Sequence, residues 1–194
     1  AINGGGVSVG DLNNDGLVDL FFISNARSNK LYINKGNLQF EDITMSSGLT
    51  QDEGLWSVGS TMADINNDGF LDIYVCMAGG KKVKSRSNLL YINNGDMTFT
   101  ESAKKFGVND SGHSTQAVFF DYDLDYDLDL IVINHSGNWN ERRPFKELDK
   151  RMDKLNRLYF YGLSVTSVVY AINVLMMINV LYQDYHSMST ISCF

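Results

Sequence analysis

The sequence has almost no proline, few cysteines and no excess of basic residues. Its 194 residues include one proline, which excludes a proline-rich linker, and two cysteines, which are too few for a disulfide framework. Lysine and arginine number 16 against 23 aspartates and glutamates, giving a net charge of −7, so nucleic-acid binding is not expected. The hydrophobic content of 44% is enough for a real core in one domain, or at most two.

Recognisable catalytic patterns are missing as well. The chain has no GxSxG, no HExxH, no cysteine–histidine pair and no nucleophile beside an evident base. Nearly half of its acidic residues are committed to three loops, so fewer remain for acid–base chemistry. We therefore predict that the protein is not an enzyme.

The acidic residues that are present gather in three repeated segments. These are DLNNDGLVDL at 11–20, DINNDGFLDI at 64–73 and DYDLDYDLDL at 121–130, and together they hold 11 of the 23 aspartates and glutamates. Like charges this close together repel each other, so the crowding needs compensation. One divalent cation in each loop would nearly cancel the net charge of −7.

A second element repeats in step with the first. It reads SNKLYINKGNLQFEDI at 28–43 and SNLLYINNGDMTFTES at 87–102, with a shorter echo, NRLYF, from Asn156. Alternation of apolar and polar residues predicts four short strands in each unit, and four antiparallel strands in 40–50 residues is the size of a β-propeller blade. A β-sandwich is the all-β alternative, but it does not require this periodicity.

The predicted fold is all-β: a partial β-propeller of about three four-stranded blades, with a short helical insert in the third. In that insert, Pro144 can start a helix in which Phe145, Leu148, Met152 and Leu155 form one apolar stripe. The predicted units are blade 1 at 1–53, blade 2 at 54–112, blade 3 at 113–162 with its helix at about 144–155, and an apolar tail of uncertain structure at 163–194.

The tail leaves three interpretations open. Its segment 163–182 is long enough to span a bilayer as a helix. The same residues include valine, isoleucine, threonine and tyrosine, which favour strands that would complete the third blade. The tail can also be sequence foreign to the repeat, because the turn and strand expected after NRLYF do not follow it.

The acidic loops have the chemistry of a calcium site. Positions 1, 3, 5 and 9 carry short side chains with oxygen atoms, position 6 of the first two loops is a glycine suited to a sharp turn, and position 7 can offer its backbone carbonyl. An Asp-Gly hairpin turn alone would not need oxygens at positions 1, 3 and 9. The predicted ligands are Asp11, Asn13, Asp15, Leu17 and Asp19 in the first loop; Asp64, Asn66, Asp68, Phe70 and Asp72 in the second; and Asp121, Asp123, Asp125, Asp127 and Asp129 in the third.

An EF-hand is excluded, since that loop needs a glutamate at position 12 and flanking helices. Position 12 is occupied here by Phe22, Val75 and Val132, inside apparent strands. Without a ligand at position 12 the site is more open, which predicts a calcium dissociation constant of roughly 10⁻⁴–10⁻³ M. Magnesium fits poorly because it demands strict octahedral geometry.

The third loop departs from the first two. Leu124 stands at position 4 and Tyr126 at position 6, where a bulky side chain is costly if the backbone needs a positive φ. Either the loop adapts and binds a cation, or it binds weakly and the backbone is strained there.

The pattern DxNxDGxxD between two strands, coupled with NxLYxNxGxxxF, resembles the FG-GAP/VCBS repeats of integrin-alpha-type propellers and of the cartilage acidic protein-like family. The resemblance covers roughly residues 4–160. It implies a propeller of about seven blades, calcium in the loop between the first two strands of a blade, and a secreted or cell-surface setting. No signal peptide is visible in the N-terminal segment AINGGGVSVGD.

The expected function is that of a calcium-binding propeller module used for extracellular binding or adhesion, in which calcium is structural and the partner is an unknown protein or carbohydrate. The alternatives are the propeller portion of a polysaccharide-acting enzyme and a fragment tethered to a membrane through 163–182. Three blades do not close a ring, so further blades are expected, from the rest of a longer chain or from self-association.

Overall fold

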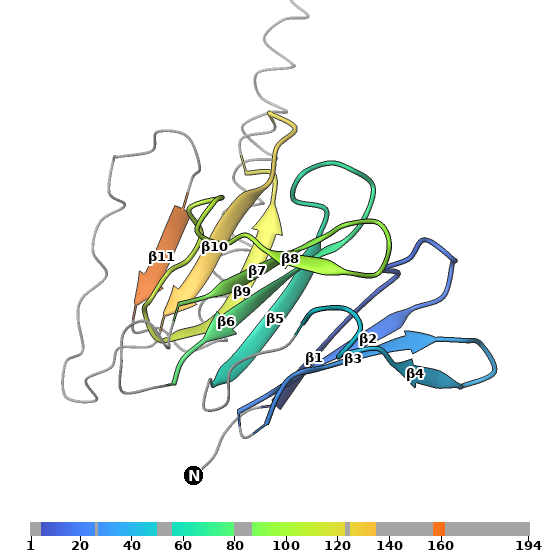
Figure 1. Cartoon of the computed structure of the whole chain (residues 1–194). Helices are drawn as coiled ribbons and strands as arrows, with labels where there is room; N and C mark the ends of the chain where they lie inside the picture. Colours follow the sequence, from blue (N-terminus) through green and yellow to red (C-terminus); the bar gives the residue numbers. More distant parts are fainter. Residues whose placement is uncertain are drawn as a thin grey trace, which may run out of the picture.

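The described part of the chain is built from strands. The structure, a computed structural model, describes residues 5–25, 27–49, 56–79, 87–122, 125–134 and 157–161, the last of these by backbone only. Within these ranges the regular elements are eleven strands in three sheets and no helix (Figure 1). The prediction of an all-β fold is confirmed.

The first two sheets repeat one architecture. Each is a four-stranded antiparallel meander in which sequence order equals spatial order. In both, an acidic loop joins the first two strands, and a glycine-containing turn joins the last two. The strands of the first sheet are β1 (Gly5–Gly10), β2 (Asp19–Ser24), β3 (Lys30–Asn34) and β4 (Phe40–Asp42). Those of the second are β5 (Ser57–Ala63), β6 (Asp72–Met77), β7 (Leu89–Asn93) and β8 (Phe99–Glu101).

The third sheet differs from the expected four antiparallel strands. It consists of β9 (Ser114–Phe120), β10 (Asp129–Asn134) and β11 (Arg157–Tyr161), in the order β11-β10-β9. β9 and β10 are antiparallel, but β10 and β11 run parallel. A parallel neighbour needs a connection of about a dozen residues or more, and residues 135–156 supply that length. The short connection between β2 and β3 does not.

Two predicted segments lie outside the described residues. They are the helical insert at about 144–155 and the tail at 163–194. Among the residues that are described, no helix is long and apolar enough to cross a membrane.

The sheets pack face to face in chain order, and each has one face on the side of the chain's later sheets and an opposite face on the side of its earlier sheets. We call these the forward face and the rear face. Because side chains alternate along a strand, odd and even positions of β2 fall on opposite faces. The forward face of the first sheet is made by Phe21, Ile23, Leu31 and Ile33, which form one core with Ile73, Val75, Met77, Tyr91 and Phe99 on the rear face of the second.

The second sheet repeats this arrangement against the third. Its forward face carries Tyr74, Cys76 and Leu90, which form a second core with Ala117, Leu130 and Val132 of the third sheet. Every residue of β6 is therefore buried, odd positions on one side and even positions on the other. Cys76 is therefore buried, and burial raises the pKa of its thiol.

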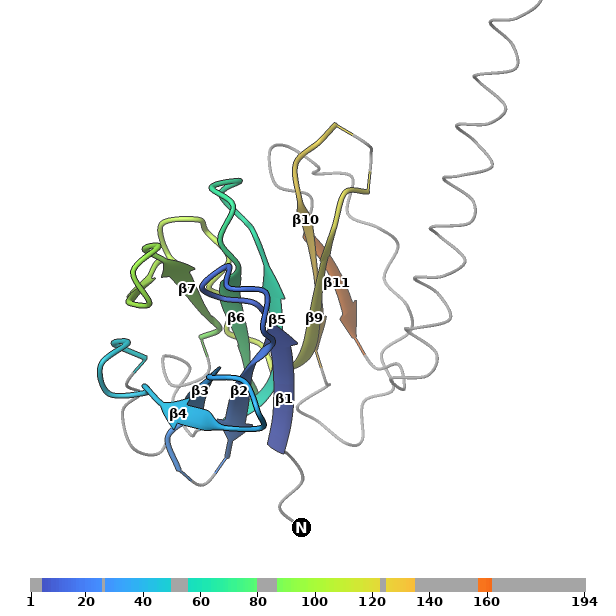
Figure 2. The ribbon, with the colours of Figure 1, turned by 90° about the vertical axis from the view of Figure 1, so that its right-hand side faces the viewer.

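The first strands of the three sheets lie side by side, β1 next to β5 and β5 next to β9 (Figure 2). Small side chains make this possible. The hydroxyl groups of Ser8 and Ser60 are 2.8 Å apart and share a hydrogen bond. A Cβ atom at Gly59 would collide with the carbonyl oxygen of Thr115, so glycine is required where β5 meets β9. The three sheets consequently fan out from a common line of first strands.

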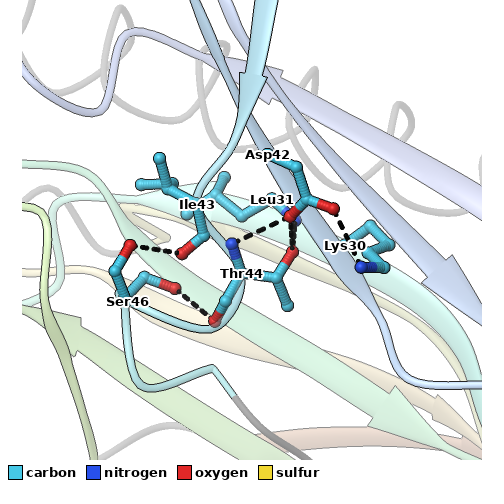
Figure 3. A network of polar contacts seen from close by, with 7 residues as sticks. Lys30, Leu31, Asp42, Ile43, Thr44 and Ser46 are labelled. Carbon is cyan, nitrogen blue, oxygen red and sulfur yellow. Dashed lines mark hydrogen bonds and ion pairs between the residues drawn. The ribbon is translucent and has the colours of Figure 1, made fainter.

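A polar network closes the outer edge of the first sheet (Figure 3). The Asp42 carboxylate accepts hydrogen bonds from the Lys30 amino group at 2.8 Å and from the Thr44 hydroxyl at 2.6 Å, and Thr44 in turn accepts one from the Leu31 amide. These donors, Lys30 first, lower the pKa of Asp42 to about 2. The network fastens β4 to β3 before the chain turns toward the next sheet.

Candidate metal centres in the acidic loops

The first acidic loop is a tight curl held by its own side chains. Both carboxylate oxygens of Asp11 accept backbone hydrogen bonds, one from Asp15 N at 3.1 Å and one from Gly16 N at 2.8 Å. Asn13 Oδ1 also accepts from Asp15 N at 3.2 Å, and Asp15 Oδ1 accepts from Leu17 N at 2.8 Å. The side chains at positions 1, 3 and 5 therefore turn into the curl from exposed backbone.

The second loop repeats these contacts almost atom for atom. Asp64 accepts from Asp68 N at 3.0 Å and from Gly69 N at 2.8 Å, while Asp68 accepts from Phe70 N at 2.9 Å. Asn66 bonds to Asp68 as Asn13 does to Asp15. Two loops 53 residues apart thus share one geometry, which their shared sequence pattern predicts.

Glycine at position 6 has the conformational role expected for it. Gly16 and Gly69 adopt φ values of +83° and +88°, and a Cβ atom at either would meet nothing within 4 Å. The requirement is therefore one of backbone conformation and not of space. Asn14 and Asn67 at position 4 are also left-handed, both with φ of +58°, a region that asparagine enters more readily than most residues.

Position 9 is unlike positions 1, 3 and 5, because it lies beneath the loop. Asp19 and Asp72 are fully buried at the first residue of β2 and of β6. Asp19 accepts from Leu12 N and from Asn34 N, each at 2.9 Å, and Asp72 accepts from Ile65 N and Asn93 N at the same distances. Each buried carboxylate therefore ties the loop to the third strand of its sheet.

Burial makes these carboxyls harder to ionise. Loss of solvent raises the pKa of Asp19 and of Asp72 above the ordinary value, and the nearby loop carboxylates raise it further. The backbone hydrogen bonds act in the opposite direction, because they favour the charged form. Additional positive charge near the loop would therefore favour the ionised form.

The third loop keeps the hydrogen-bond pattern at the cost of strain. Asp121 accepts from Asp125 N at 3.2 Å and from Tyr126 N at 3.0 Å, as in the other loops. Asp125 accepts from Asp127 N, and Asp129 from Tyr122 N. Tyr126 has φ of +73° and is 96% exposed, so the loop adopts the glycine conformation with a tyrosine in place. Asp123 lies outside the described residues.

The two complete loops contact each other. Asn14 Nδ2 of the first loop donates to Gly69 O of the second at 2.9 Å, and Asn93 Nδ2 of the second sheet donates to Leu12 O of the first loop at 2.8 Å. Each sheet therefore supplies one side chain to the loop of the other. Asn34 and Asn93, which bind the buried position-9 carboxylates through their backbone amides, were not predicted from the sequence. The recurrence of YIN before the glycine turn could have drawn attention to them.

The donor set of each loop suits a hard cation only if oxygens of several kinds take part. In the part of the chain that the structure describes, no group of three or more acidic, histidine or cysteine side chains is arranged to hold a metal ion. Each complete loop presents one exposed carboxylate, one half-buried carboxylate and an asparagine amide, since its third carboxylate is buried below. A carboxylate that accepts two hydrogen bonds still has lone pairs available. The set is all oxygen, as calcium prefers.

Comparison with known proteins points to a repeat family and to a curated relative. Residues 11–75 match the model of a family described as FG-GAP-like repeat. Cartilage acidic protein 1 of Xenopus tropicalis is 31% identical over 159 residues, which cover 79% of this chain and 24% of that protein. The chain thus spans about a quarter of the length of the curated relative it matches.

Proposed function

Since the chain is an FG-GAP repeat protein, we propose that it is a calcium-binding β-propeller module that acts in binding or adhesion outside the cell. The observation that carries the proposal is the repeated loop: in two curls with matching hydrogen bonds, two carboxylates and an amide lie close together at positions that solvent can reach. Such crowding is unfavourable without a cation.

The packing of the sheets supports a propeller. Three sheets fan out from adjacent first strands, and each forward face packs on the next rear face in chain order. In a propeller, blades are arranged about a central channel with their innermost strands toward it. The parallel β11 is the departure from a regular blade in the described part of the chain.

Each loop residue has a defined part in the proposed calcium site. Asp11, Asn13 and Asp15 supply side-chain oxygens, and the Leu17 carbonyl supplies one from the backbone, with the equivalent set at Asp64, Asn66, Asp68 and Phe70. When bound, calcium supplies positive charge that offsets the repulsion among the carboxylates. The buried Asp19 and Asp72 position the loops by their hydrogen bonds to the backbone. In the third loop we assign Asp121, Asp123, Asp125 and Asp127 to the calcium site and Asp129, at position 9, to the positioning role.

We propose a structural and not a catalytic role for the bound ion. The sequence offers no nucleophile with an evident base. Asp19 and Asp72, whose pKa values are raised, already accept hydrogen bonds from backbone amides. The extracellular setting is supported by the similarity to a cartilage acidic protein. The partner would then be a protein or a carbohydrate, and not a nucleic acid, given the net charge of −7.

Calorimetric titration with calcium tests the proposal. The full chain should take up calcium with a dissociation constant of roughly 10⁻⁴–10⁻³ M. The double variant Asp15→Asn plus Asp68→Asn keeps the side-chain volumes and the acceptors for Leu17 N and Phe70 N but removes two charges, and it should lose most of the uptake. A matched control, Glu41→Gln plus Asp96→Asn, removes two acidic charges outside the loops and should bind as wild type. Equal uptake by all three proteins would remove the assignment.

A further inference from the structure

The sequence contains two acceptor motifs for N-linked glycans, of the form Asn-X-Ser in which X is not proline. They are Asn109-Asp110-Ser111, in the connection from β8 to β9, and Asn134-His135-Ser136, which starts at the last residue of β10. The motif is short enough to occur by chance, so the surroundings of each asparagine decide whether it can carry a glycan. The structure gives these two asparagines opposite surroundings.

Asn109 lies at the surface, between two residues that are held inward. The Val108 side chain is buried, and the Val108 carbonyl accepts a hydrogen bond from the Tyr74 hydroxyl at 2.7 Å. On the other side, the Asp110 carbonyl accepts a hydrogen bond from the Asn88 amide, also at 2.7 Å. Asn109 itself is exposed to solvent. The two anchored neighbours therefore keep this asparagine outside the packed sheets, where a bulky substituent has room.

Asn134 is buried and its side-chain amide is already engaged. It is 1% exposed, its Nδ2 atom donates to Asp110 Oδ2 at 2.8 Å, and its Oδ1 atom accepts from the Ser114 hydroxyl at 2.8 Å. A single carbon atom added at Gly112 would lie only 2.9 Å from Asn134 Nδ2. A sugar ring bonded to that nitrogen therefore has no room in the folded structure.

We propose that Asn109 is an N-glycosylation site and that Asn134 is not, an inference that rests on the extracellular setting in the proposed function. In the reaction, Asn109 Nδ2 attacks the anomeric carbon of an oligosaccharide carried on a polyprenyl diphosphate. The N–C bond forms as the C–O bond to the diphosphate breaks, Nδ2 loses one proton, and the polyprenyl diphosphate leaves. The Ser111 hydroxyl completes the motif that the oligosaccharide transferase recognises.

The glycan at Asn109 lies far from the third acidic loop. Asn109 precedes β9, which begins at Ser114, whereas the acidic loop follows the other end of this strand at Phe120. Because β9 has seven residues at about 3.3 Å each, its two ends are about 20 Å apart. The glycan therefore covers the end of the third sheet opposite its acidic loop, and it leaves that loop open to a cation.

Expression of the full chain behind a cleavable secretory signal peptide in cultured animal cells tests the assignment. Tandem mass spectrometry measures occupancy at each asparagine before and after treatment with peptide N-glycosidase, which leaves aspartate in place of a glycosylated asparagine. Wild type should carry a single N-glycan, on Asn109. The variants Asn109→Gln and Ser111→Ala should lose it, whereas Ser111→Thr should keep it because threonine also supplies the hydroxyl.

Ser136→Ala is the matched control, because it removes the second motif without changing Asn134, and it should carry the same glycan as wild type. Wild-type protein with unmodified Asn109 in both cells and medium would overturn the proposal. A glycan on Asn134 of folded, secreted protein would do the same. Occupancy is read in the cells as well as in the medium, so a variant that is not secreted still gives a result.

This test is separate from that of the proposed function. The added signal peptide delivers the chain to the transferase whatever the native location of the protein, so occupancy reports on the Asn109 site alone. Calcium uptake is measured by calorimetry on the acidic loops. A protein that carries the glycan but binds no calcium would refute the calcium site and uphold Asn109, and the reverse result would do the opposite.

Discussion

The buried aspartate at position 9 should matter more for folding than the exposed aspartate at position 5. In Asp72→Ala, the amides of Ile65 and Asn93 lose their acceptor. Each buried unsatisfied amide costs about 1–3 kcal/mol, so the two cost about 2–6 kcal/mol. Removing a carboxylate that burial already disfavours offsets part of this, as the raised pKa of Asp72 indicates. We expect a net loss of about 2–4 kcal/mol in the free energy of unfolding.

The assay is urea unfolding of the full chain in excess chelator, which removes any contribution of a bound cation. The midpoint and the slope together give the change in unfolding free energy. Asp68→Ala is the matched control, because this residue occupies an exposed part of the same loop, and it should cost less than about 1 kcal/mol. The loss of unfolding free energy in Asp72→Asn should lie between those of Asp72→Ala and Asp68→Ala, since an amide oxygen can still accept one hydrogen bond. If Asp72→Ala and Asp68→Ala unfold at the same midpoint, the division of roles between the two positions is wrong.

Three further outcomes are expected. Asp42→Asn should lower the free energy of unfolding by at most about 1 kcal/mol at neutral pH, because the ion pair of Asp42 with Lys30 is largely exposed to solvent. The pKa of Asp42 is lowered to about 2, so its contribution to stability is present above the unfolded value of 3.8. In a stability–pH profile that contribution should disappear as pH falls from 3.8 toward 2. Tyr126→Gly should leave the protein as stable as wild type or more stable in thermal unfolding. Relief of the backbone strain at φ of +73° contributes about 1–2 kcal/mol, whereas the greater entropy of glycine in the unfolded chain costs about 0.5–1 kcal/mol. Gly69→Tyr, at φ of +88°, should destabilise the protein. Calcium at about 100 times its dissociation constant should add about 2.7 kcal/mol per site and raise the melting temperature, an effect that chelator reverses and magnesium does not restore.

Periodicity in the sequence was sufficient to predict the strands and loops of the first two sheets. Alternating apolar residues placed β2 and β3, and the glycines at positions 16 and 69 marked the left-handed turns. These features depend on local chemistry that the pattern contains. The same periodicity could not give the direction of β11, because the motif NRLYF does not determine chain direction, whereas the length of the connection at 135–156 is what permits a parallel strand.

The loop pattern predicted which residues have oxygen but not where each lies. Positions 1, 3, 5 and 9 read as four equivalent ligands, yet position 9 is buried and engaged by two backbone amides. Strand parity held the missing information, since Asp19 alternates with Phe21 and Ile23 and so belongs to the buried face of β2. The backbone partner at Asn34 is 15 residues away, beyond any local pattern.

The hydrogen bond from Asn14 to the Gly69 carbonyl has a consequence for how the loops respond to a ligand. The Gly69 peptide group in the second loop is oriented by a side chain from the first loop, so neither loop can rearrange without disturbing the other. Occupancy of the first loop should therefore alter affinity in the second, and a titration curve for the pair should depart from that of two identical independent sites.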